Sequence, residues 1–445
     1  MRAQVSEAIE NLLQAGQFER AEKAAEAEVR VHPGNARAWA DLGLSEAKLG
    51  KAARAIRAFE MAASLNPTDS HPWLNLALLY TSADDLDKAI PCFARGVALD
   101  PHSESGWYNY GRVLLAKGRA GEAVSSFQHA LALAPDDAGA RLSLVQSFLR
   151  DRQLSAAQAE VERILNTHSR SRELLLKLGQ TLETEGRPAE SLQVLHKALG
   201  LFPKDSDLLV QLSRTQVSLN LTEDAIRSAG EALKLAPRSL SVNLAFAEAL
   251  VSAHQYERLL EFLRGVQPQF ETAAELYYML GIAHFGLNNR QSAIQAFSHA
   301  VELDPRLDLA HFMLGTTFLV TADFPRAEQH YKTAIALNSK NSLYYSYLMR
   351  VYRANGFQEG AFETARKALA LNPGDVDSRL ELAKWEFNQE NLSQARSLLE
   401  SLVADAPDFI PAHVFLARLY FRLELSQLAE DQARIISSLE QKRRK

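Results

Sequence analysis

Residues 104–137 read ESGWYNYGRVLLAKGRAGEAVSSFQHALALAPDD, and stretches with the same pattern precede and follow them without a gap. The pattern restarts every 34 residues along nearly the whole chain. Its thirteen copies begin at Arg2, Ala36, Ser70, Glu104, Ala138, Arg172, Ser206, Leu240, Ala274, Asp308, Ser342, Val376 and Ile410. We therefore expect a single continuous array of thirteen repeats over residues 2–443, with a short basic tail at residues 440–445.

Each repeat predicts two helices, because its apolar residues are spaced by three and four, the period of a helix with one buried face. The eighth position of the repeat is Gly, Ala or Ser in ten of the thirteen copies, and the twentieth is Ala in eleven. Side chains this small allow two helices to approach closely. We expect these two positions to face each other, with large residues such as Phe127 at position twenty-four filling the space between helices.

Two positions predict the breaks between helices. Position fifteen holds residues such as Gly118 and Asn220, which tolerate the left-handed backbone that ends a helix. At nine of the twelve junctions between repeats a proline stands at the same place, as Pro101 and Pro135 do. Proline cannot continue the preceding helix but fits a turn that opens the next one.

The residues at these positions carry a family resemblance. The following match the signature of the tetratricopeptide repeat: Trp107, Tyr110, Gly111, Leu114, Ala123, Phe127, Ala130 and Pro135. This resemblance implies an all-α fold, a right-handed α-solenoid superhelix of about thirteen helix hairpins. First helices would line a concave groove, with second helices outside.

Two repeats depart from the signature. The fifth repeat has Arg141, Val161 and Ser169 at signature positions, and the eighth has Asn243, Leu259 and a proline displaced to Pro268. We interpret these departures as bends or softer joints in the array.

Composition narrows the class of protein. Apolar residues make up 47% of the chain and charged residues 23%, which is typical of a folded domain. The net charge of −5 predicts no general attraction to nucleic acid. No segment is long and apolar enough for a signal peptide or a membrane span, so we expect a cytoplasmic protein. The single cysteine, Cys92, is expected to be a buried structural thiol.

Catalytic motifs are absent from the sequence. The twelve histidines show no metal-ligand spacing, and no glycine-rich phosphate loop is present. His284 and His311 stand at signature core positions, where packing is the expected role. The sequence therefore predicts that the chain is not an enzyme, with no catalytic residues, no metal and no cofactor.

Positions two, six, nine and thirteen of each first helix form one stripe, which the family fold would turn toward the groove. Position six holds Asn75 and Asn109. They are similar to the asparagine ladder of the repeat domain of O-linked N-acetylglucosamine transferases, which implies binding of an extended peptide backbone. An amide suits that role because it both donates and accepts hydrogen bonds. Solvated polar residues are the alternative interpretation.

Repeats nine to eleven place apolar residues on or beside the stripe, namely Met279, Ile282, Phe312, Met313 and Tyr347. Such residues on a face that should be wet indicate a binding patch. Tight local packing, or closure of the groove by another copy of the chain, explains the same residues.

Basic residues follow the apolar patch on or near the same stripe, among them Arg350, Lys384 and Arg418. Guanidinium groups hold carboxylates in paired hydrogen bonds. The sequence thus predicts a ligand that is an extended or helical peptide with apolar anchors followed by acidic residues. A solvated charged face is the competing interpretation.

These observations predict a protein-interaction scaffold or adaptor whose partners are other proteins or peptides. A self-assembling structural subunit is the first alternative, because the last repeat has no extra capping helix. Its C-terminal end would then leave these residues partly exposed: Leu423, Leu425, Leu428, Ile435 and Ile436. The repeat portion of a larger enzyme, such as a glycosyltransferase, is the second alternative.

Overall fold

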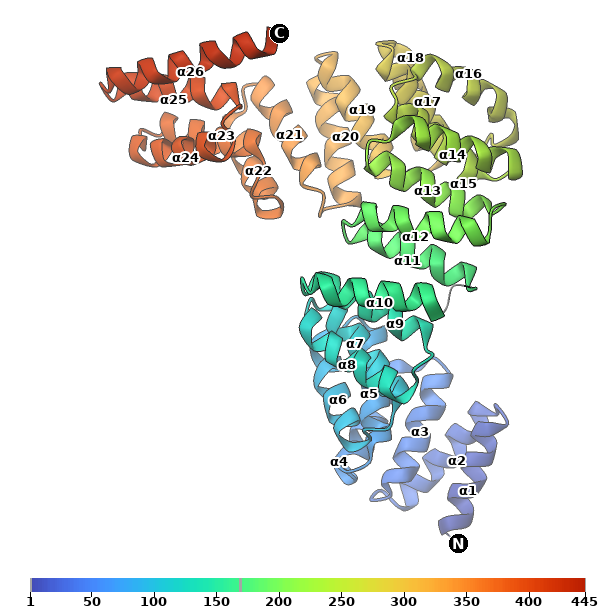
Figure 1. Cartoon of the computed structure of the whole chain (residues 1–445). Helices are drawn as coiled ribbons and strands as arrows, with labels where there is room; N and C mark the ends of the chain where they lie inside the picture. The colour runs from blue at the N-terminus through green and yellow to red at the C-terminus, as the bar shows by residue number, and fades with distance from the viewer. Residues whose placement is uncertain (1, 168–169, 445) are drawn as a thin grey trace. The chain divides into compact units, whose positions relative to one another are not determined.

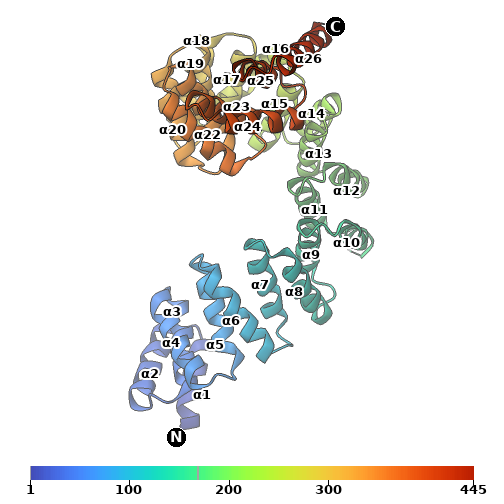
Figure 2. The same ribbon diagram turned by 90° about the vertical axis from the view of Figure 1, so that its left-hand side faces the viewer.

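A computed structural model describes residues 2–167 and 170–444 of the chain. Over these residues the backbone forms α-helices, one short 3-10 helix and connecting turns, with no strand. The predicted all-α solenoid fold is thereby confirmed. The chain divides into two compact units, Met1–Leu219 and Asn220–Lys445, which we call the first unit and the second unit. Within each unit the helices lie in successive pairs (Figures 1 and 2).

The first unit contains helices α1 (Arg2–Gln14), α2 (Phe18–Val31), α3 (Ala36–Lys48), α4 (Ala52–Leu65), α5 (Ser70–Ser82), α6 (Leu86–Leu99), α7 (Glu104–Ala116), α8 (Ala120–Leu133), α9 (Ala138–Arg150), α10 (Leu154–Thr167), α11 (Arg172–Thr184), α12 (Pro188–Leu201) and α13 (Ser206–Ser218).

The second unit contains α14 (Thr222–Leu235), α15 (Leu240–Ser252), α16 (Tyr256–Val266), the 3-10 helix η1 (Gln267–Gln269), α17 (Ala274–Gly286), α18 (Arg290–Leu303), α19 (Asp308–Val320), α20 (Phe324–Leu337), α21 (Ser342–Ala354), α22 (Gln358–Leu371), α23 (Val376–Asn388), α24 (Leu392–Asp405), α25 (Ile410–Arg422) and α26 (Ser426–Arg444).

The odd-numbered helices, which we call first helices, begin where the 34-residue pattern restarts, from Arg2 in α1 to Ile410 in α25. The division between the two units falls inside the seventh repeat. That all thirteen repeats form one continuous array over residues 2–443 stays a prediction. None of the described helices is long and apolar enough to cross a membrane.

Position fifteen has a left-handed backbone in every repeat, with φ between +54° and +80°. Glycine, asparagine or aspartate occupies it in eight repeats, as the sequence predicted. The remaining five repeats place other residues there, namely Arg152, His254, Ala322, Glu390 and Glu424. The turn geometry is therefore imposed by the packing of the hairpin even where the local residue disfavours it.

In several hairpins a glycine at position eight lies against a large residue at position twenty-four. A Cβ atom on Gly111 would approach the ring of Phe127 to 2.9 Å, and one on Gly281 would approach Phe297 to 2.4 Å. Positions eight and twenty also face each other as predicted, since Ser191, at position twenty, donates to the carbonyl oxygen of Gly179, at position eight, at 2.8 Å.

In several repeats the side chain at position four binds the carbonyl oxygen of the junction proline six residues earlier. Trp39 Nε1 donates to Pro33 O at 2.8 Å, and Trp107 Nε1 donates to Pro101 O at 3.0 Å. Trp73 differs, because its Nε1 has no hydrogen-bond partner among the described residues. A proline turn leaves this carbonyl without a helical partner, so where the bond forms it ties the turn to the helix that follows.

The residues that depart from the signature keep this bond. Asn243 Nδ2 lies 2.9 Å from the carbonyl oxygen of Pro237, and Arg141 also donates to the carbonyl of Pro135. The interpretation that the fifth repeat is a softer joint gains no support from Arg141. Ser169 lies outside the described residues. In the eighth repeat α16 is short and η1 follows it around Pro268, as a displaced proline would require.

Histidine takes the position-four role in two repeats. His311 is buried, with Nε2 3.2 Å from Pro305 O and Nδ1 3.1 Å from Nδ1 of His330. His413 Nε2 lies 2.9 Å from Pro407 O. Packing is therefore the role of His311, as predicted. Cys92 is likewise buried, and burial raises the pKa of its thiol.

The C-terminal helix differs from the other second helices. Helix α26 has 19 residues where α24 has 14. The basic residues predicted as a tail continue this helix as far as Arg444.

Candidate peptide-binding surfaces

A groove of about 780 Å³ runs along the first helices α1, α3 and α5 of the first unit. Its wall includes side chains from the predicted stripe positions: Glu10, Arg37, Asp41, Leu44, His71 and Asn75. The expectation that first helices line a groove therefore holds for these three helices.

The two asparagines predicted to bind peptide backbone each donate a hydrogen bond to their own helix. Asn75 Nδ2 lies 2.9 Å from His71 O, and Asn109 Nδ2 lies 2.8 Å from Ser105 O. Both side chains are half-buried, and Asn75 belongs to the wall of the groove. This bond uses one of the two N–H hydrogens of each amide, so the other N–H and the carbonyl oxygen are the groups with which the amide could pair a peptide.

Asp41 occupies the same repeat position as Asn75 but lacks a proton to donate. Its Oδ2 atom is buried and has no hydrogen-bond partner among the described residues. Burial raises the pKa of Asp41 to about 6; Arg37 acts to lower it and Glu10 to raise it. Asp41 as a whole is half-buried and lines the groove, so a cation that enters the groove would stabilise its ionised carboxylate.

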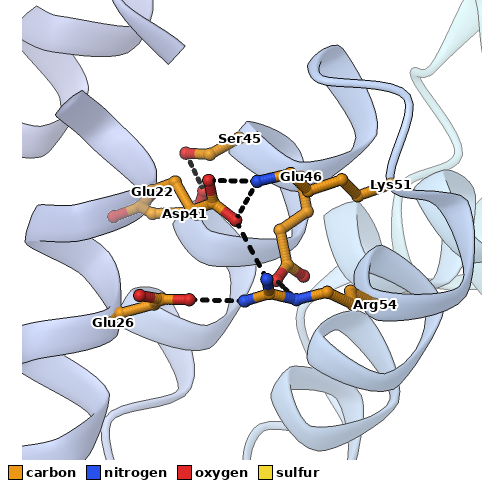
Figure 3. Close-up of polar contacts among 7 residues, drawn as sticks. All are labelled: Glu22, Glu26, Asp41, Ser45, Glu46, Lys51 and Arg54. Carbon is orange, nitrogen blue, oxygen red and sulfur yellow. Dashed lines mark hydrogen bonds and ion pairs between the residues drawn. The ribbon is translucent and has the colours of Figure 1, made fainter. Parts of the chain in front are cut away.

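A second acidic group lies beside the groove on α2 and α3. Carboxylate oxygens of Glu22, Glu26 and Glu46 all lie within 4.8 Å of one another. Two cations already occupy this cluster, since Lys51 Nζ is 2.6 Å from Glu22 and Arg54 Nε is 2.7 Å from Glu46 (Figure 3). The group is therefore an ion-pair network that joins two repeats, and its geometry does not call for a metal ion.

In the second unit, large apolar side chains are exposed at stripe positions. Leu309 in α19 and Leu343 in α21 both stand at position two and are 43% and 47% exposed. Val320, at position thirteen of α19, is 56% exposed. Residues spaced by eleven on a helix share one face, so Leu309 and Val320 mark the two ends of the same open surface.

Phe312, which the sequence placed in the binding patch, lies in the core. It is 9% exposed, its ring stacks on Tyr344 with centroids 5.1 Å apart, and its edge meets Tyr347 at 5.0 Å. Ile282, Met313 and Tyr347 are half-buried against the same core cluster. Position five therefore packs on the next hairpin, which explains why a large residue is tolerated there.

Met279 is half-buried at position six of α17. With Ile282 and Met313 it retains part of its surface on the first-helix side. These residues widen the patch marked by Leu309 and Leu343, but none is as exposed as those leucines.

The basic residues predicted next to the patch lie over aromatic rings. The Arg350 guanidinium is 4.6 Å from the Tyr347 ring and forms an ion pair with Asp377. Lys384 Nζ lies 3.7 Å from Glu381, and burial lowers its pKa. Two of the three predicted cations are therefore already paired with carboxylates.

Arg418 is the most open of these cations. Its guanidinium lies 5.4 Å from the ring of Phe387 and 5.7 Å from the ring of Phe415, and the residue is exposed. A cation held over two rings keeps its donors free for a carboxylate while its orientation is restricted.

Sequence reasoning missed Asp41, Leu309, Leu343 and Val320 as members of the two surfaces. The signal was present, since all four stand at positions two, six or thirteen of the stripe. Leucine occurs at position two in these two repeats alone among the thirteen.

Comparison with known proteins finds partial relatives. The chain is 24% identical over 259 residues to the BBSome complex member BBS4 homolog of Drosophila melanogaster, covering 51% of this chain and 52% of that protein. It is 22% identical to the human protein O-mannosyl-transferase TMTC1, covering 50% of this chain and 25% of that protein. The chain thus spans about half the length, or less, of these relatives.

Among solved structures, the crystal structure of the APC/C hetero-tetramer Cut9-Hcn1 has a TM-score of 0.44 at 17% identity, covering 92% of this chain and 95% of the matched chain.

Sequence models described as tetratricopeptide repeat match residues 7–70, 74–138, 114–178, 274–307, 312–376 and 358–419. Together these segments cover more than half of the chain, and they follow the helix hairpins described above. The chain belongs to the tetratricopeptide repeat family.

Proposed function

We propose that this chain is a protein-interaction scaffold that holds a segment of a partner protein on the first helices of its second unit. The observation that carries the proposal is the exposed pair Leu309 and Leu343, at the same position of adjacent repeats. Exposed leucines also occur at position thirty, as Leu337 does in α20, but there they recur throughout the array. Leucine stands at position two in these two repeats alone, so the hairpin does not require it there. This favours a contact with a partner.

The partner segment is proposed to carry apolar anchors followed by acidic residues. Leu309, Met313, Leu343 and Tyr347 would receive the anchors, with Met279 and Ile282 at the edge of the patch. Arg350, Lys384 and Arg418 would receive the carboxylates. Because Arg350 and Lys384 already face Asp377 and Glu381, Arg418 would contribute most of the net attraction.

In the first unit, Asn75 and Asn109 are proposed to pair with the backbone of a bound peptide. Each amide would use its second N–H and its carbonyl oxygen for the peptide, while its bond to the helix holds its orientation.

Assembly through the C-terminal end is a second candidate function. In α25, Val414 and Phe421 are 50% and 78% exposed, whereas Leu380 and Phe387, at the same positions of α23, are each 3% exposed. The preceding pair is covered by the next hairpin, so the last hairpin presents an open stacking face. Leu428 and Ile435 of α26 are also exposed. A chain that stays monomeric over a wide concentration range in sedimentation would exclude this candidate.

The scaffold proposal is tested with fluorescent peptides that carry two leucines followed by three glutamates, measured by anisotropy against the full chain. The double variant Leu309→Ser and Leu343→Ser should weaken binding at least tenfold, because it removes both anchors. Leu337→Ser, a leucine of similar exposure on a second helix, is the matched control and should leave binding unchanged. Equal affinity for the double variant and the control would reject the proposed surface.

A further inference from the structure

We propose that the groove along α1, α3 and α5 binds a basic segment of a protein partner, with a lysine or arginine of that segment paired to Asp41. This inference rests on the proposed scaffold function but concerns a different surface, of opposite charge. Three observations carry it: the groove itself, the unpaired carboxylate in its wall, and the charges around that carboxylate.

The carboxylate stands where the next two repeats place an amide. The side-chain amides of Asn75 and Asn109 each donate a hydrogen bond to the backbone carbonyl oxygen four residues earlier. A carboxylate accepts hydrogen bonds and cannot donate one, so Asp41 gains nothing from that carbonyl. Its buried Oδ2 is left without a partner among the described residues. Such a group is stabilised by whichever ligand brings a cation to it.

The surrounding charges favour a cation over an anion. From α1, Glu10 forms an ion pair with Arg37 of α3 at 2.6 Å, which makes that pair neutral. From the start of α5, the Asp69 carboxylate accepts from the backbone N–H of His71 at 3.0 Å and lies 2.9 Å from its Nδ1. The carboxylates of Asp41 and Asp69 both line the groove and make it negative beside the neutral Glu10–Arg37 pair.

The size of the groove indicates a peptide segment and not a single ion. Its volume of about 780 Å³ corresponds to several residues, and Leu13, Leu44 and Phe59 supply apolar wall. The aliphatic stem of a lysine or arginine packs on such a wall while its charged end reaches a carboxylate.

Binding should depend on pH with a defined sign. Burial raises the pKa of Asp41 to about 6, and only the ionised form attracts a cation. Affinity should therefore fall by about tenfold between pH 7.5 and pH 5. The variant His71→Gln, which removes the imidazole from the groove wall, should keep most of the pH dependence, whereas Asp41→Asn should lose it.

The experiment uses the full chain and two fluorescent pools of twelve-residue peptides, in which lysine or arginine alternates with randomised positions, or glutamine replaces the basic residue. Wild type should bind the basic pool at least tenfold more tightly than the glutamine pool, and Asp41→Asn should abolish the difference. Glu60→Gln, which removes a carboxylate on α4 that binds Tyr80, is the matched control and should behave as wild type.

Asp41→Asn also separates a binding role from a structural one. The variant introduces the amide found in the next two repeats, so it should unfold at the same or a higher temperature than wild type. It should nevertheless lose its affinity for the basic peptide pool. Retention of the basic pool by Asp41→Asn would overturn the inference, as would equal binding of both pools by wild type. A self-association that Asp41→Asn removes would also overturn it, since the occupant would then be a second copy of the chain.

The outcome is independent of the surface proposed for the second unit. Leu309→Ser with Leu343→Ser should leave the basic pool unaffected, and Asp41→Asn should leave the leucine–glutamate peptide unaffected. Loss of both probes in either variant would overturn the assignment of two separate sites.

Discussion

The groove along α1, α3 and α5 in the first unit carries the carboxylate of Asp41, whereas the patch on α19 and α21 in the second unit exposes leucines, although both are built on the same repeat. At position six, Asp41 and Asn75 in the first unit correspond to Met313 and Tyr347 in the second. The hairpins around them are alike, with a left-handed residue at position fifteen and a buried residue at position twenty-four, which is aromatic in three of the four and Ala365 in the fourth. The comparison shows that the stripe positions vary freely because the hairpin fold does not depend on them.

The largest expected effect tests whether the two units are stabilised separately. Phe127 and Phe297 are each fully buried against a glycine. Replacing either ring by alanine should reduce the free energy of unfolding by about 3–5 kcal/mol, because it removes buried area and leaves a cavity. Hydrogen exchange should locate the lost protection in the unit that carries the substitution. An equal loss in both units would show that they unfold together.

The next effect concerns the free energy of unfolding, whose dependence on pH should have opposite signs in the two units. Burial, with the nearby His311 and Arg326, lowers the pKa of His330 to about 4. Below its unfolded pKa the unfolded state binds more protons, so the second unit should lose about 1–3 kcal/mol as pH falls from 7 through 4. Hydrogen exchange across this range measures the loss, and His330→Gln should flatten it. An unchanged slope in that variant would exclude His330 as the cause.

In the first unit the raised pKa of Asp41 has the reverse consequence. The folded state there binds more protons than the unfolded state between about pH 3.8 and pH 6. Its contribution to stability is therefore present at low pH and is lost as pH rises through about 6, to the extent of about 1–3 kcal/mol. Urea unfolding at pH 4.5 and pH 7 should show Asp41→Asn to be stabilising at the higher pH alone.

The smallest effect concerns the turns that both units share. Ala322 has a φ of +60°, which strains an alanine, whereas Gly356 occupies the equivalent turn with a φ of +76°. Ala322→Gly should raise the free energy of unfolding by about 0.5–1 kcal/mol, and Gly356→Ala should lower it by a similar amount. The midpoints of urea unfolding give both values. A loss of stability in Ala322→Gly would mean that the alanine methyl makes a contact worth more than the strain.

Much of the fold could be predicted because the residues that set the helices and turns recur at the same positions in many repeats. The first helices begin where the pattern restarts, and position fifteen takes the left-handed backbone that its glycines indicated. Positions eight and twenty face each other, and Phe127 at position twenty-four closes on Gly111, as the small and large residues at these positions indicated.

The candidate binding surfaces were predicted less well, for a different reason. Stripe membership follows from helical spacing, and Asn75 lines the groove of the first unit as its place on the stripe predicted. That Met313 and Arg418 contact a partner stays a prediction. Exposure depends on what the next hairpin covers. Phe312 is large and apolar like Leu309, yet one lies in the core and the other is open.

The sequence by itself determined the hairpin, its length and its turns, because these depend on spacing, on small residues and on backbone preference within 34 residues. Only the tertiary structure decided which side chains remain available, since that is settled by contacts between neighbouring repeats. Asp41 illustrates the difference: its place on the stripe could be counted, but its unpaired, buried oxygen exists only where α1, α3 and α5 come together.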